Sequence, residues 1–252
     1  MGTVAATRRC PAALLRAGRA RLGAAGGARA FLLGAAPAGM LEPSKCLPGN
    51  AETNRKAPKA DDKHHTLGTR LHPPFPEGTE MIVLGMGCFW CSEDLYMRRK
   101  GIHSTHVGYA QGVTENPTYA EVCTGKTNHN EVVRLVYHPD QVSLEDLLAT
   151  FFEKHDPTTP NQQGNDMGTQ YRSGIYYYSE SQAAVAEEMK DKYQKALDSL
   201  QGPGAFGTVV TEIEPAKTFY YAELEHQQYD AKPFARGYCG LRPIGVPFPQ
   251  DE

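Results

Sequence analysis

The sequence lacks several features that define common protein classes. It has no run of 18 apolar residues, so it contains no segment typical of a membrane-spanning helix. It has no internal repeat and no phosphate-binding glycine loop. Its single C-x-x-C pair, Cys88 with Cys91, falls short of the two paired spacings usual in structural zinc sites. We therefore expect no membrane association and no bound metal.

Acidic residues are absent from the first 41 positions, which hold six arginines. An Arg-rich, acid-free segment is typical of a mitochondrial transit peptide. We predict that residues 1–40 are a targeting segment and that the protein is mitochondrial, with the cytosol as a second location. Without these arginines the formal net charge of −3 becomes −9. The rest of the chain is therefore acidic, which argues against nucleic acid as a partner.

Cysteine is also scarce, with six in 252 residues. A domain of this size does not need disulfide cross-links, so we expect reduced thiols whose chemistry matters more than their bonding. Residues 41–79 are polar and interrupted by prolines, and we interpret them as a flexible linker. We predict that residues 80–252 form one catalytic domain with an irregular C-terminal tail rich in glycine and proline.

Hydrophobic periodicity gives the expected elements of this domain. We predict strands at 81–84, 131–137, 175–178, 209–213 and 219–222, helices after residue 88, after residue 143 and over 179–200, and polar loops at 106–117 and 156–174. Few strands and a mixed order of elements predict an α+β domain. We expect a two-layer sandwich with a mixed sheet and a ferredoxin-like core.

The junction between the first strand and the first helix carries Cys88. Two glycines, Gly85 and Gly87, allow a tight turn there. The unpaired N–H groups and the dipole at a helix N-terminus favour the thiolate, which is the reactive form of cysteine. A lone cysteine is more often buried and inert, but this position favours a nucleophilic or redox role for Cys88.

Motifs spread along the domain resemble those of class A peptide methionine sulfoxide reductases. They occur in the family's order from about residue 80 to 245, and they are Gly87-Cys88-Phe89-Trp90, Asn116-Pro117-Thr118-Tyr119, Glu121-Val122-Cys123, His129 with Glu131, Gln163-Gly164-Asn165-Asp166, Gln170-Tyr171-Arg172-Ser173, His226-Gln227-Gln228-Tyr229 and Gly237-Tyr238-Cys239-Gly240. The resemblance covers the whole predicted domain. Enzymes of this type reverse the formation of methionine sulfoxide.

The resemblance implies a role for each candidate site residue. Reduction of a sulfoxide needs a thiolate that attacks sulfur and an acid that protonates the departing oxygen. Cys88 is expected to be the nucleophile, and Glu131 the acid if burial keeps it protonated near neutral pH. Further implied roles are hydrogen bonds to the sulfoxide oxygen from Tyr119 and Tyr171, an apolar wall from Phe89 and Trp90, and a hold on the substrate from Asp166. We interpret His129 as a loop residue and Cys123 as structural.

The resemblance also implies that Cys88 becomes a sulfenic acid, which a second thiol converts to a disulfide. No bound cofactor is expected, and thioredoxin would be the external reductant. Position 91 is Cys where the family generally has Gly. Two residues three apart on a helix have Cβ atoms roughly 5–6 Å apart, whereas a disulfide needs about 3.5–4.5 Å. We therefore predict that Cys239 is the main resolving thiol, with Cys91 as the alternative or a second relay.

Other functions remain open from the residues alone. Cys88 and Cys91 also form the C-x-x-C pattern of a thioredoxin-like disulfide oxidoreductase. That alternative leaves the motifs around Tyr119, Glu131 and Tyr171 unexplained. A degenerate relative that binds oxidised methionine without turnover is a third reading. We expect oxidised proteins and peptides as partners and substrates, with free methionine sulfoxide also reduced, and a monomeric enzyme.

Overall fold

The computed structural model describes residues 39–235, 237 and 239–250. Nearly all of the predicted targeting segment lies outside these described residues. In chain order the elements are η1 (Pro43–Lys45), β1 (Glu80–Met86), α1 (Phe89–Tyr96), β2 (Ile102–Ala110), α2 (Tyr119–Cys123), β3 (Asn130–Tyr137), α3 (Leu144–Lys154), β4 (Gln162–Gln163), β5 (Asp166–Met167), η2 (Thr169–Tyr171), β6 (Ser173–Tyr177), α4 (Glu180–Gln201), β7 (Glu212–Pro215), β8 (Tyr220–Tyr221) and η3 (Tyr229–Ala231).

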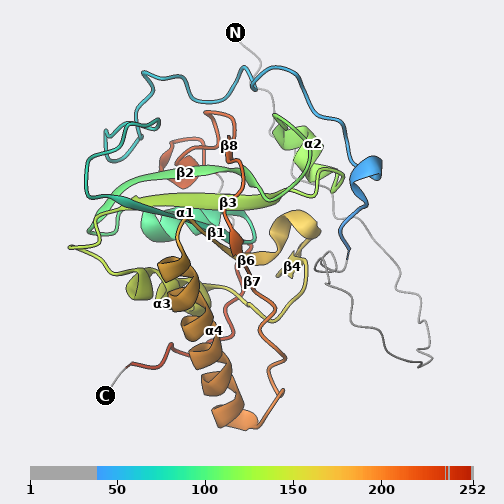
Figure 1. Cartoon of the computed structure of the whole chain (residues 1–252), viewed down its shortest axis with the longest axis vertical. Helices are drawn as coiled ribbons and strands as arrows, with labels where there is room; N and C mark the ends of the chain where they lie inside the picture. The colour runs from blue at the N-terminus through green and yellow to red at the C-terminus, as the bar shows by residue number, and fades with distance from the viewer. Residues whose placement is uncertain (1–38, 236, 238, 251–252) are drawn as a thin grey trace.

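One mixed sheet of six strands organises the domain, with the order β7-β6-β1-β3-β2-β8. The pair β6 and β7 is parallel, and the other neighbours are antiparallel. The central four strands with α1 and α3 follow the chain order β1-α1-β2-β3-α3-β6. This order and pairing confirm the predicted α+β class and ferredoxin-like core. In Figure 1, α3 and α4 lie on one side of the sheet.

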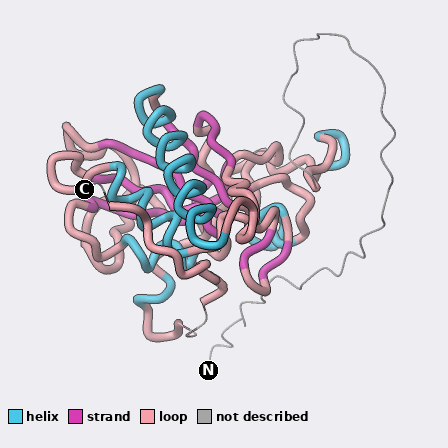
Figure 2. Tube along the Cα trace, turned by 90° about the horizontal axis from the view of Figure 1, so that it is seen from below, coloured by secondary structure: helices cyan, strands magenta, loops and turns pink. Residues whose placement is uncertain are grey.

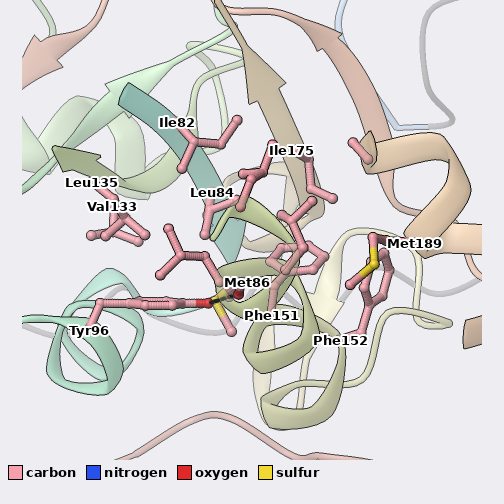
Figure 3. Packing of buried hydrophobic residues seen from close by; sticks show 14 of the residues in the cluster. Ile82, Leu84, Met86, Tyr96, Val133, Leu135, Phe151, Phe152, Ile175 and Met189 are labelled. Carbon is pink, nitrogen blue, oxygen red and sulfur yellow. Dashed lines mark hydrogen bonds between the residues drawn. The ribbon is translucent and has the colours of Figure 1, made fainter. Parts of the chain in front are cut away.

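The main core fills the space between the sheet and its helices (Figure 3). Strands β1, β3 and β6 contribute aliphatic side chains, among them Ile82, Leu135 and Ile175, none of which is exposed. The apolar stripe of α3 meets them, as its sequence pattern predicts. Figure 2 shows the long helix α4 lying across the strands. Its residues Met189 and Tyr193 belong to the buried core. These apolar contacts fix the strand ends that carry the site.

The predicted loop at 106–117 is wrong in its first part, because β2 runs to Ala110. Its sequence looks like a loop because it is polar, yet its polar side chains are buried and hydrogen-bonded. Tyr109 Oη donates to Glu223 Oε2 at 2.9 Å, and His106 Nε2 lies 3.0 Å from Ser104 Oγ. Burial with partners is the usual condition for such groups.

Residues 41–79, which we interpreted as a linker, hold one helical turn, η1, and isolated bridges. Figure 1 shows this segment in blue to teal, running past β8 and α2. It contacts the domain along its length: Leu41 N–H donates to Asn128 Oδ1 at 3.0 Å, Asn54 Nδ2 to Glu223 Oε1 at 2.9 Å, and Leu71 is fully buried. The segment therefore packs on the same body as the site.

The C-terminal tail has no regular element after η3 among its described residues, as predicted. The tail nevertheless packs against the helices. Phe248 stacks on Tyr193 with ring centroids 5.9 Å apart, and Tyr193 Oη donates to the carbonyl of Val246 at 3.1 Å. No helix in the described part of the chain is both long and apolar enough to cross a membrane.

Leucine-to-alanine substitutions on α3 and α4 should lower the free energy of unfolding by different amounts. Leu147 on α3 is fully buried, whereas Leu200 on α4 is 59% exposed. Leu147→Ala should lower the free energy of unfolding by about 2–5 kcal/mol, because it leaves a cavity. Leu200→Ala should change it by less than about 0.5 kcal/mol. Urea denaturation followed by circular dichroism measures both, and equal costs would contradict this description of the core.

Candidate active site

Cys88 lies between β1 and α1, where the sequence predicts it. Gly87 has φ +97°, and a Cβ there would lie 2.6 Å from Gln163 Cβ, so only glycine fits. Cys88 is the N-cap of α1, and its carbonyl accepts from Ser92 N–H at 3.2 Å and from Ser92 Oγ at 3.0 Å. Cys88 is thus held at the helix start, and the residue is 7% exposed.

Glu131 stands on the central strand β3 beside the start of α1. Its Oε2 accepts from Phe89 N–H at 3.3 Å, and its Oε1 is buried without a hydrogen-bond partner among the described residues. Burial and, to a smaller extent, the charge of Asp166 raise the pKa of Glu131 to about 8. The carboxyl therefore keeps its proton at neutral pH, which is the condition that an acid role requires.

Tyr119, Tyr171 and Asp166 converge on the same place from three elements. Tyr119 is the first residue of α2, Tyr171 is in η2 and Asp166 is in β5. Burial raises the pKa of both tyrosines, and charges on Glu131, Asp166 and Cys88 raise it further. Both hydroxyls therefore stay protonated and able to donate hydrogen bonds beside Cys88 and Glu131.

Aromatic rings form one wall of the site. Phe89 is buried and Trp90 half-buried, with ring centroids 6.1 Å apart. Tyr119 stacks with both at 6.3 Å, and Tyr229 stacks on Trp90 at 4.2 Å. Flat apolar surface of this kind suits a methyl group or a thioether stem.

Two residues that sequence reasoning left without a role hold this wall in place. His226 Nδ1 accepts a hydrogen bond from Trp90 Nε1–H at 3.2 Å, so this nitrogen carries no proton. Burial lowers the pKa of His226, which favours the neutral imidazole. Glu223 Oε1 accepts from Tyr119 N–H at 2.9 Å, and its Oε2 lies 3.9 Å from His226 Nε2. The only sequence signal was the motif that begins at His226.

A buried carboxyl network ties α1 to η3. Glu93 accepts from Gln228 N–H at 2.6 Å, from Gln228 Nε2 at 2.7 Å and from Thr105 Oγ1 at 2.7 Å. Gln228 has φ +47°, an uncommon conformation for this residue type. The network holds the turn from which Tyr229 reaches Trp90. Burial raises the pKa of Glu93 to about 7.

Three thiols meet beside this wall. Cys91 is buried on the first turn of α1, and its Sγ accepts from Gly240 N–H at 3.3 Å. The neighbouring thiols of Cys88 and Cys239 both act to lower the pKa of Cys91. Cys88, Cys91 and Cys239 are free, whereas Cys123 is disulfide-bonded, so our expectation of reduced thiols fails for Cys123.

The structure brings all nine predicted site residues together.

The predicted thiolate at Cys88 is wrong for this arrangement. The hydrogen bond to Cys91 and burial raise the pKa of Cys88. The same bond lowers the pKa of Cys91 to about 7, helped by the bonds from Cys239 and Gly240. The dipole of α1 favours a thiolate at Cys88, but the neighbouring Cys91 thiol has the larger and opposite effect on its pKa. The negative charge of the free site thus rests on Cys91, which can take the proton of Cys88.

Comparisons with known proteins agree with this site. The family model "Peptide methionine sulfoxide reductase" matches residues 80–244. The human "Mitochondrial peptide methionine sulfoxide reductase" is 49% identical over 217 residues, which is 86% of this chain and 88% of the relative. "Peptide methionine sulfoxide reductase MsrA 1" from a Synechocystis species is 50% identical, over 83% and 90% of the two chains.

Solved structures show the same likeness. "Methionine sulfoxide reductase A of Corynebacterium diphtheriae" superposes with a TM-score of 0.70 at 40% identity, over 82% of this chain and 99% of that one. Mxr1 from Saccharomyces cerevisiae in its reduced form gives 0.60 at 35% identity, over 70% and 99% of the two chains. The chain belongs to the peptide methionine sulfoxide reductase family. The class A resemblance predicted from the motifs is confirmed.

The raised pKa of Glu131 makes a prediction about stability. A carboxyl with a raised folded pKa stabilises the fold below its unfolded pKa, near 4.5, and loses that contribution as pH rises to about 8. Glu131→Gln cannot ionise, so its free energy of unfolding relative to the wild type should increase between pH 5 and pH 8. Chemical denaturation measures the difference. The exposed Glu187→Gln on α4 is the control and should show no such trend.

Proposed function

We propose that this protein reduces methionine S-sulfoxide, in proteins and as the free amino acid, to methionine. One observation carries the proposal: a nucleophilic thiol at Cys88 lies beside a buried, protonated carboxyl at Glu131, and an aromatic wall borders both. Family membership supports the reaction, and the choice of the S epimer follows the class A resemblance. The thioredoxin-like alternative is not favoured, because the family match covers residues 80–244.

The geometry supports a role for each residue before chemistry begins. The substrate's methyl group lies against Phe89 and Trp90, and its sulfoxide oxygen accepts hydrogen bonds from Tyr119 and Tyr171. Asp166 holds the backbone side of the substrate. These contacts place the sulfoxide sulfur in front of the Cys88 thiol, which accounts for much of the rate advantage of an enclosed site.

In the reductive step the Cys88 sulfur attacks the sulfoxide sulfur. Its proton passes to Cys91, which already accepts its hydrogen bond. Glu131 gives its proton to the sulfoxide oxygen as negative charge develops there. The oxygen then moves to Cys88, methionine leaves, and Cys88 is a sulfenic acid. A second thiol converts this acid to a disulfide, and a dithiol reductant, thioredoxin by the resemblance, restores the free thiols.

Substitution of Cys88 and of Glu131 should impair the reductive step in two different ways. Cys88→Ser should abolish release of methionine from peptides that carry S-sulfoxide, because the sulfur proposed to attack is lost. Glu131→Gln should lower the single-turnover rate by about 10²–10⁴-fold while binding changes little, since the acid acts in the transition state. Chromatography of the peptide products measures both. Glu187→Gln is the control with a normal rate.

Several outcomes would contradict the proposal. Appreciable turnover in Cys88→Ser would remove Cys88 from the reaction. Binding of sulfoxide peptide by the wild type without turnover would favour a binding protein over an enzyme. Brisk reduction of insulin disulfides without reduction of either sulfoxide epimer would favour the thioredoxin-like alternative.

We also propose that residues 1–40 direct the protein to mitochondria and that the catalytic domain of residues 80–252 acts as a monomer. The six arginines and the names of the mammalian relatives support the location. The cytosol remains a proposed second location.

Fusion of residues 1–40 to a fluorescent protein should place it in mitochondria. The same fusion with its six arginines replaced by glutamine should stay in the cytosol, because the positive charge that marks a transit peptide is lost. Fluorescence microscopy with a mitochondrial marker distinguishes them. A diffuse signal from the unmodified fusion would contradict the targeting role.

A further inference from the structure

Part of the segment before β1 runs beside both pieces of chain that complete the aromatic wall (Figure 1). We call this part, residues 50–65, the strap. Backbone hydrogen bonds fix its course: Asn50 N–H donates to the carbonyl of Glu115 at 2.9 Å, and Leu224 N–H donates to the carbonyl of Lys56 at 2.7 Å. The strap precedes the residues that the family model matches, so family membership assigns it no role.

Asn54 of the strap points its amide nitrogen at Glu223. Its Nδ2 donates to Glu223 Oε1 at 2.9 Å, and its Oδ1 accepts from Lys56 N–H at 3.1 Å. The second contact identifies the oxygen of the amide, because a backbone N–H needs an acceptor. The strap therefore presents a hydrogen-bond donor to a carboxyl group whose residue is 5% exposed.

Glu223 connects Asn54 to Tyr119. The same Oε1 accepts from Tyr119 N–H at 2.9 Å, and Oε2 accepts from Tyr109 Oη at 2.9 Å. Tyr119 is the first residue of α2, so its N–H is one of those that the helix itself leaves without a partner. A carboxyl that accepts three hydrogen bonds has little freedom to rotate. Asn54 thus helps to fix the position at which Tyr119 begins its helix.

A second contact of the strap supports the other end of the wall. His65 N–H donates to Gln228 Oε1 at 3.0 Å. Gln228 has φ +47°, a sparsely populated conformation that persists where surrounding contacts hold it. The next residue, Tyr229, stacks on Trp90 with ring centroids 4.2 Å apart. The strap therefore helps to hold the turn from which Tyr229 reaches Trp90.

His64 acts on the same turn through the interior of the domain. Burial lowers the pKa of His64 to about 3, so its imidazole is neutral, and Nδ1 accepts from Leu67 N–H at 3.2 Å. The proton is therefore on Nε2, which donates to Thr105 Oγ1 at 2.8 Å. Thr105 donates in turn to Glu93, which accepts both N–H contacts of Gln228. Every donor in this chain meets an acceptor.

We propose that the strap holds the aromatic wall in position and that Asn54 is the positioning residue that aligns Tyr119 with the substrate. This inference rests on the proposed function, because the aligned group is the Tyr119 hydroxyl that donates to the sulfoxide oxygen. The strap is thus a working part of the active site, in place of the flexible linker predicted from its composition.

Substitution of Asn54 separates this role from passive covering of the surface. Asn54→Asp keeps the size of the side chain and the acceptor for Lys56 N–H, but it turns a carboxylate oxygen toward Glu223. Asn54→Ala removes the donor without adding a charge. Arg55→Gln is the matched control on the neighbouring residue, because the Arg55 side chain is 88% exposed and pairs with the exposed Glu52.

The decisive measurement is the single-turnover rate of methionine release from an S-sulfoxide peptide, with enzyme in excess and no reductant. This rate does not depend on recycling, and unfolding curves followed by circular dichroism correct it for the folded fraction. Asn54→Asp should lower it by about 10–100-fold, because a small displacement of an aligned group is costly. Asn54→Ala should lower it about 2–10-fold, as for one lost hydrogen bond. Arg55→Gln should keep the wild-type rate.

Trp90 provides a second measurement that needs no turnover. It is the single tryptophan of the chain, and its Nε1–H donates to His226, which lies beside Glu223. Its fluorescence emission in the free enzyme should therefore change in Asn54→Asp and stay unchanged in Arg55→Gln.

The two ideas fail in different ways. Wild-type single-turnover rates in both Asn54 variants, after correction for the folded fraction, would overturn the role of the strap and leave the proposed function standing. A wild type that releases no methionine would overturn the proposed function. In that case unchanged Trp90 emission in Asn54→Asp would overturn the strap's hold on the wall as well, and a changed emission would support it.

Discussion

A carboxyl group buried without compensation for its charge is the constraint on which this site depends. Glu131 stands on the central strand β3, and its only hydrogen-bond partner in the described part of the chain is Phe89 N–H, which satisfies one of its two oxygens. A buried carboxylate in such surroundings is costly, so the group keeps a proton that water would remove. The fold thereby holds a neutral acid beside a thiol.

The sheet places the acid, and the segments around the sheet complete the site. β1 delivers Cys88 at its end, and the antiparallel neighbour β3 brings Glu131 alongside. The segment at 39–79 reaches Glu223 through Asn54, and the tail reaches Cys91 through Gly240. Both ends of the described chain therefore support the reacting groups, although neither has much regular structure of its own.

Hydrogen bonding between thiols, together with burial, explains how Cys88 and Cys91 divide their charge. Cys88 is enclosed beside Glu131, and a thiolate there would lose its water without gaining a cation. Cys91 accepts hydrogen bonds from two thiols and a backbone N–H, so it carries the charge more easily. The nucleophile is therefore neutral until its proton moves to Cys91. This arrangement limits the exposure of a reactive thiolate when no substrate is bound.

Much of the fold follows from local patterns in the sequence. Three features can be predicted from the sequence because each depends on residues within its own segment. They are the strand before Cys88, the apolar stripe of α3 and the N-cap of α4 at Ser179. The full length of β2 cannot be predicted in this way, because its polar residues are buried by partners from other segments, such as Glu93. Propensity cannot anticipate burial that depends on tertiary contacts.

The candidate site shows the same division. Residue types and motifs predict Cys88, Glu131 and the aromatic wall. They do not predict the hydrogen bond between Trp90 and His226, because the motif around His226 does not specify which residue lies next to it in the fold. They also misplace the thiolate, because the hydrogen bond between Cys88 and Cys91 depends on a backbone conformation at the helix start that spacing alone does not fix.

The protonation of Glu131 in the free enzyme tests the central claim most directly. Infrared difference spectra between the wild type and Glu131→Gln isolate the carboxyl band of this one residue. The account predicts a protonated-carboxyl band that is present at neutral pH and is lost as the pH rises through about 8. A band that disappears near the ordinary glutamate pKa of about 4.3 would show an ionised Glu131 and would contradict the account.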